Sequence, residues 1–156
     1  MIFIAIEPDG MHPRFDADSV WATYVGAKTV KRIPFPRQLD EQLRLPCVPV
    51  SIEPVWTLPD CGDATALLRN GKINQAQLNA LHGAFALPAP QHQLFGYKFS
   101  EQGFAVHNDQ ELLLQLDSDG LLDVMFGDGG RLHVFKPKGM PLRPSLAKLT
   151  VELDCG

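Results

Sequence analysis

The stretch ELLLQLDSDGLLDVMFGDGGRLHVF, residues 111–135, decides the fold of this 156-residue chain. Apolar and polar residues alternate in three short runs, as in strands that bury one face. An Asp-Gly turn signal separates each run from the next. We therefore predict a C-terminal three-stranded antiparallel meander over about residues 111–135, within a β-rich α+β fold built mainly on an antiparallel sheet.

The register of this meander follows from matching the apolar faces of its strands, because a slip of one residue would turn every side chain to the other face. Leu116 is then expected opposite Leu122. Phe126 is expected opposite Leu132. Each hairpin has a three-residue loop, and its last residue is a glycine in the left-handed region. These two glycines are Gly120 and Gly130.

The opposite face of the meander mixes apolar with polar side chains. Its polar members are Gln115, Asp117, Asp123, Arg131 and His133. The predicted register makes Gln115 face Asp123. Such a face is either partly covered, here by residues 91–110, or a binding surface, and we favour cover. The five polar residues and His92 are the candidate binding residues, and no catalytic residue is assigned.

Aspartates gather at the two turns, at Asp117, Asp119, Asp123 and Asp128. The segment DSDG does not have the glycine spacing of an EF-hand loop. Capping of Asx turns by these aspartates is the favoured interpretation, and a divalent-cation site is the alternative. None of the five histidines is spaced as HxH or HxxxH, so we predict no metal ligand and no cofactor.

Two short helices are predicted, over about residues 64–70 and 75–86. Asp63 is a suitable N-cap for the first. Asn74 and Gln77 have the spacing of a capping box for the second. Further strands are expected at residues 2–6, 19–33, 47–52, 54–57 and 146–154.

The composition indicates a single globular domain spanning residues 1–156, with 45% hydrophobic and 21% charged residues. A net charge of −4 disfavours general nucleic-acid binding. No apolar run is long enough to cross a membrane. The cysteines are Cys47, Cys61 and Cys155. They form no CxxC motif, and we expect reduced thiols and a cytoplasmic protein, with a single bridge or a reactive thiol as the alternative.

Three segments together resemble the YwqG-like family of bacterial proteins: HQLFGY at 92–97, LLLQLDSD at 112–119 and FGDGGRLHVF at 126–135. Phe126 stands where that family usually has tryptophan. The family also usually carries an extra N-terminal region, so the chain is expected to be a shortened member or a domain fragment. The resemblance implies a β-rich α+β fold and no established activity.

No arrangement of residues in the sequence is typical of a catalytic centre. We therefore expect a non-catalytic bacterial protein-binding module, in its sharpest form an immunity-like protein that neutralises a toxin or effector partner. Its acidic turns would meet basic residues of that partner. The alternative is an enzyme of unknown class that uses His133 or His92 with Asp117 or Asp123. Neither nucleic acid nor membrane is an expected partner, and the oligomeric state stays open.

Overall fold

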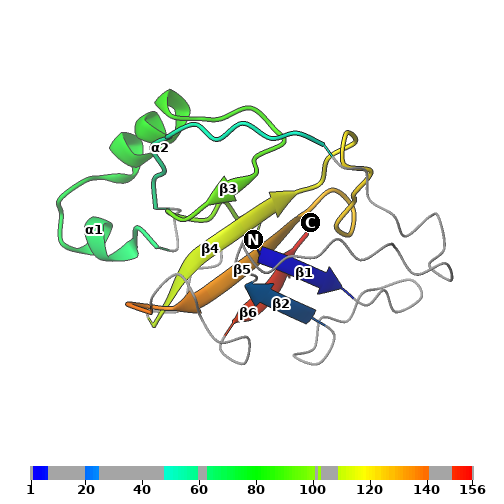
Figure 1. Cartoon of the computed structure of the whole chain (residues 1–156). Coiled ribbons are helices and arrows are strands. Elements are labelled where there is room, and N and C mark those ends of the chain that lie inside the picture. The colour runs from blue at the N-terminus through cyan, green and yellow to red at the C-terminus, as the bar shows by residue number, and fades with distance from the viewer. Residues whose placement is uncertain are drawn as a thin grey trace, which may run out of the picture.

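The computed structural model describes residues 2–6, 20–24, 48–59, 63–100, 102, 109–140 and 149–155. A four-stranded antiparallel sheet with strand order β3-β4-β5-β6 forms its centre (Figure 1). The strands are β3 (Gln93–Leu94), β4 (Gln110–Asp117), β5 (Arg131–Pro137) and β6 (Thr150–Asp154). Since neighbours in the chain are neighbours in the sheet, the C-terminal part is an antiparallel meander. The predicted β-rich α+β fold is confirmed.

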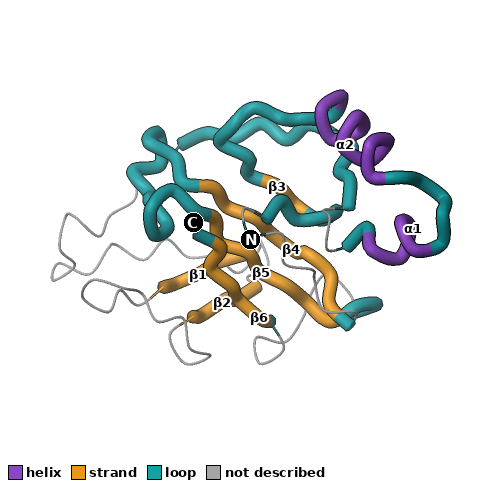
Figure 2. Tube along the Cα trace, turned by 180° about the vertical axis from the view of Figure 1, so that it is seen from behind, coloured by secondary structure: helices purple, strands orange, loops and turns teal. Residues whose placement is uncertain are grey.

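The other elements are β1 (Ile2–Ile6), β2 (Val20–Tyr24), α1 (Thr65–Arg69) and α2 (Gln75–Ala84). β1 and β2 pair as a separate two-stranded antiparallel sheet. The helices lie beyond the β3 edge of the larger sheet (Figure 2). The predicted capping box is present, because the side chain of Asn74 accepts from the Gln77 N–H and that of Gln77 accepts from the Asn74 N–H.

β5 is an inner strand, and its residues from Arg131 to Lys136 are all buried. An irregularity in its pairing with β4 at Leu113 changes which residues of β4 share a face, so Leu112 and Leu113 are both buried. The buried hydrophobic residues are Ala64, Leu78, Leu112, Leu113, Phe126, Leu132, Val134 and Phe135. The core therefore centres on β4 and β5, which most of these residues occupy or adjoin.

The predicted strand at residues 122–126 is wrong. β5 pairs directly with β4, so Leu116 lies opposite Leu132 and not opposite Leu122. The meander consists of β4, β5 and β6, and the connection between β4 and β5 is a loop at residues 118–130. Alternation over so few residues does not distinguish a strand from a compact loop with several inward-facing side chains.

Side-chain hydrogen bonds hold this loop in a path in which its apolar residues do not pair as a strand. The Ser118 hydroxyl donates to the Gly130 carbonyl at 2.8 Å and accepts from the Phe126 N–H at 2.9 Å. Asp119 and Val124 exchange backbone hydrogen bonds of 2.9 and 3.1 Å. These bonds use the backbone groups that a strand ladder would need.

The expected left-handed conformations of Gly120 and Gly130 are also wrong. The loop residues with positive φ are Asp123 at 52°, Gly127 at 59° and Gly129 at 103°. Gly130 is required for a different reason: a Cβ there would overlap the carbonyl oxygen of Asp154 and lie 2.7 Å from the Cα of Cys155. The absence of a side chain lets the loop pass closely over the end of β6.

Residues 48–59 contain no strand, contrary to the prediction of short strands at 47–52 and 54–57. The large apolar side chains of this segment are exposed: Val48, Val50, Ile52, Val55 and Trp56. Cys155 is a free thiol, whereas Cys47 and Cys61 lie outside the described residues.

The two glycines of the loop give a matched test of this packing. Gly130→Ala should lower the free energy of unfolding by roughly 1–3 kcal/mol, because backbone atoms must move to admit the methyl group. Gly120→Ala should change it by less than about 0.5 kcal/mol, since nothing lies within 4 Å of a Cβ there. Urea denaturation measures both. Equal stabilities of the two variants would contradict the observed close approach.

Candidate functional site

Four of the predicted binding residues lie together on β4 and β5. Gln115 pairs with His133, and Asp117 pairs with Arg131, in neighbouring positions of the ladder. All four are buried. The predicted facing of Gln115 and Asp123 is wrong, because Asp123 is an exposed residue of the 118–130 loop.

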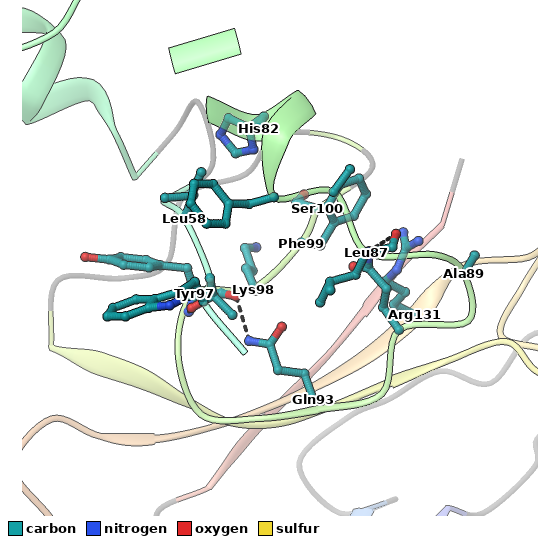
Figure 3. A pocket seen from close by; sticks show the side chains of 15 residues that line it. Leu58, His82, Leu87, Ala89, Gln93, Tyr97, Lys98, Phe99, Ser100 and Arg131 are labelled. Carbon is teal, nitrogen blue, oxygen red and sulfur yellow. Dashed lines mark hydrogen bonds between the residues drawn. The ribbon is translucent and has the colours of Figure 1, made fainter. Parts of the chain in front are cut away.

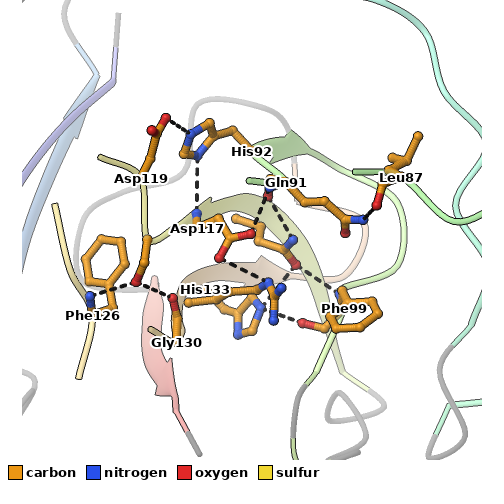
Figure 4. Close-up of polar contacts among 12 residues, drawn as sticks. Leu87, Gln91, His92, Phe99, Asp117, Asp119, Phe126, Gly130 and His133 are labelled. Carbon is orange, nitrogen blue, oxygen red and sulfur yellow. Dashed lines mark hydrogen bonds and ion pairs between the residues drawn. The ribbon is translucent and has the colours of Figure 1, made fainter. Parts of the chain in front are cut away.

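Residues 91–100, which we call the cover segment, lie against these buried polar side chains (Figure 4). The Gln91 N–H donates to Asp117 Oδ2 at 2.8 Å. The guanidinium of Arg131 lies 4.5 Å from the ring centroid of Phe99, a cation–π contact, and forms an ion pair with Asp117 at 3.4 Å. The favoured interpretation of the mixed face, cover by the segment that precedes β4, is thus confirmed for residues 91–100.

The Gln115 side chain joins the sheet to both ends of the cover segment. Its Oε1 accepts from the Phe99 N–H at 2.9 Å and from His133 Nε2 at 3.1 Å. Its Nε2 donates to the Gln91 carbonyl at 3.0 Å. A fully buried amide is stable only when it is hydrogen-bonded in this way. Gln115 therefore clamps the cover segment to β4 and β5.

His133 is a second clamp, and it is neutral at pH 7. Its Nε2 lies 3.1 Å from two acceptors, the Phe99 carbonyl and Gln115 Oε1, so Nε2 carries the proton. Burial, and then the nearby charge of Lys98, lower the pKa of His133 to about 4. Among the described residues Nδ1 has no hydrogen-bond partner, and no carboxylate bonds to this ring.

His92 contacts a carboxylate that the sequence did not suggest. The Asp117 N–H donates to His92 Nδ1 at 3.2 Å, so the proton lies on Nε2, which donates to Asp119 Oδ2 at 3.0 Å. Asp119 Oδ1 also accepts from the Leu121 N–H at 2.7 Å, which is the predicted Asx turn. The hydrogen bond from His92, followed by that from Leu121, holds the pKa of Asp119 below its usual value.

A pocket of about 420 Å³ opens beside the cover segment (Figure 3). Residues 56–58, the end of α2 with the chain after it, and the cover segment form its walls. Its aromatic side chains are Trp56, Phe85, Tyr97 and Phe99, and its cations are Lys98 and Arg131. None of the described lining residues carries a carboxylate. Sequence reasoning missed this pocket, whose only signal is the lysine between two aromatic residues in YKF.

Gly96 lets residues 56–58 approach the cover segment. It has a φ of 78°, and a Cβ at this position would overlap the side chain of Thr57. The following Tyr97 N–H donates to Thr57 Oγ1 at 3.1 Å. The wall that contains Trp56 is therefore attached to the cover segment through a position that needs glycine.

Within the described ranges, no three His, Cys, Asp or Glu side chains gather as metal ligands would. The aspartates of the two turns, the alternative cation site, therefore form no such group among the described residues. The same part of the chain contains no helix with the length and apolarity needed to span a bilayer.

The depressed pKa of His133 predicts a pH dependence of stability. The unfolded state takes up a proton near pH 6.5 and the folded state only near pH 4, so the stability due to neutral His133 is complete above pH 6.5 and is lost as the pH falls toward 4. Between pH 7 and pH 5 the free energy of unfolding should fall by about 1–2 kcal/mol more in the wild type than in His133→Gln.

Chemical denaturation at both pH values measures this difference. His82→Gln controls for the loss of a histidine and should behave as the wild type does. Parallel pH profiles for the wild type and His133→Gln would show that burial does not keep His133 neutral.

Residues 22–155 match the family described as "Domain of unknown function (DUF1963)". Searches of the curated proteins and of the solved structures gave no match. The matched range contains the central sheet, the cover segment, the 118–130 loop and the pocket, and it is well over half of the chain. The chain belongs to the DUF1963 family of domains of unknown function.

Proposed function

We propose that this protein is a non-catalytic module that binds a protein partner through the 118–130 loop. The observation that carries this proposal is the exposure of two large apolar side chains on an ordered loop: Leu121 is 77% and Met125 is 76% exposed. Asp123 and Asp128, both exposed, accompany them. Apolar side chains beside charged ones are a common composition of protein-binding surfaces.

The internal hydrogen bonds of the loop favour such a role. Ser118 and Asp119 bind backbone groups across the loop, and the Gly130 N–H donates to the Phe126 carbonyl at 2.7 Å. A loop held in this way loses little conformational freedom on binding, so less of the interaction energy is spent on ordering it. Leu121 and Met125 therefore project from a loop whose backbone is held in place by hydrogen bonds.

The chemistry of the loop defines the partner that it fits. Leu121 and Met125 require an apolar depression in the partner, and Asp123 and Asp128 require basic residues around it. Charge complementarity of this kind mainly increases the rate of association and decreases with added salt.

Affinity capture from the native host tests the proposal. The wild-type protein should retain a stoichiometric partner, and Leu121→Ser/Met125→Ser should reduce the affinity for it at least about tenfold, as expected for central apolar contacts. The thermal stability of the variant should equal that of the wild type, because both side chains are largely exposed.

Val50→Ser/Ile52→Ser is the matched control, because these side chains are each 80% exposed but lie outside the loop. This variant should keep the partner. Capture of no stoichiometric partner at any salt concentration, or equal capture by the loop variant, would contradict the proposal.

The sharpest form of this proposal is a cytoplasmic bacterial immunity-like protein, the role expected from a sequence without a catalytic motif and with acidic turns. The captured partner would then be a toxin or effector whose active cleft is lined with basic residues. The exposed carboxylates of Asp123 and Asp128 support this version, because they suit such a cleft.

An enzyme is the second candidate, and one observation favours it. His92 and Asp119 form an imidazole–carboxylate pair at 3.0 Å, with side chains 31% and 11% exposed. This pair, rather than His133 with Asp117 or Asp123, would provide acid–base chemistry. The pocket weakens this candidate, since its described walls contain neither residue.

A further inference from the structure

Lys98 is a buried cation on the wall of the pocket. Only 3% of its surface is exposed. Its ammonium lies 5.8 Å from the ring centroid of Phe135, and no described residue forms a hydrogen bond or an ion pair with it. Figure 3 shows Lys98 within the ring of lining side chains, with Tyr97 on one side and Arg131 on the other.

The other buried cations of the sheet have acidic partners. Arg131 pairs with Asp117 and lies opposite Asp154 in the ladder with β6. Lys136 pairs with Glu111. A buried charge without such a partner costs free energy, and an anion that enters the pocket would recover part of that cost. Lys98 therefore differs from Arg131 and Lys136 in lining the cavity without an acidic partner among the described residues.

The other lining residues indicate the chemical class of the ligand that carries the anionic group. Trp56, Phe85, Tyr97 and Phe99 present aromatic surface, and Leu58 and Leu87 add aliphatic surface. The volume of about 420 Å³ is near the lower end for small-molecule pockets. A compact ligand with one flat apolar part and one anionic group matches the volume, the apolar walls and the charge of Lys98.

We propose that this pocket binds a small aromatic carboxylate, with the Lys98 ammonium as the partner of the carboxylate and the aromatic walls around the ring. The charge-assisted hydrogen bond forms at a buried ammonium, where it is stronger than at the surface. The inference does not depend on the proposed protein-binding function, because the pocket and the 118–130 loop share no residue.

Two compounds that differ in charge test this assignment by isothermal titration calorimetry: 1-naphthaleneacetate and its neutral amide, 1-naphthaleneacetamide. The wild type should bind the acid at least about tenfold more tightly than the amide. Lys98→Met keeps the apolar stem and removes the charge, so its affinities for the two compounds should become equal. Lys138→Met, at an exposed lysine, should keep the wild-type preference.

Two-dimensional NMR of the wild type gives an independent result if Lys98→Met fails to fold. The acid should shift the amide signals of residues 97–99. Lack of binding by the acid at millimolar concentration, equal binding of both compounds, shifts confined to other residues, or a preference that survives in Lys98→Met would each overturn the proposal.

Discussion

The arrangement of this protein depends on the hydrogen bonds of one buried amide, that of Gln115. It binds the Gln91 carbonyl, the Phe99 N–H and His133 Nε2 at distances between 2.9 and 3.1 Å. These contacts hold both ends of the cover segment against β4 and β5. Without them, the buried amide of Gln115 would be left without hydrogen-bond partners, which costs free energy. The pocket depends on the same contacts, because the cover segment supplies Tyr97 to Ser100 of its wall.

The hydrogen bonds of Gln115 change how the polar face of β4 and β5 is interpreted. Gln115, Asp117, Arg131 and His133 look from sequence like a binding or catalytic surface, but hydrogen bonds and an ion pair join them to one another and to the cover segment. A network whose members satisfy each other rigidifies a core. The groups without such contacts lie elsewhere: exposed acidic and apolar side chains on the 118–130 loop, and the buried Lys98 on the wall of the aromatic pocket.

The parts of the fold that were predicted from sequence are those that local patterns determine. The capping box of α2 and the existence of β4 and β5 as strands belong to this class. The 118–130 loop was mistaken for a strand because the hydrogen bonds of Ser118 and Asp119, rather than hydrophobic periodicity, fix its path. The four polar residues were grouped correctly, since a period of two places them on one face. Lys98 was missed because its burial depends on segments distant in the chain, including residues 56–58.

Amide hydrogen exchange in a Gln115→Leu variant tests the clamp most directly, since leucine keeps much of the volume and removes all three contacts. We predict that the Phe99 amide exchanges at least about tenfold faster than in the wild type, while amides of Leu132 and Val134 in β5 stay protected. Such a result would show that the cover segment opens as a unit when the amide is lost. Unchanged protection of Phe99, or the same acceleration at all three amides, would show that the Gln115 amide does not hold the cover segment in place.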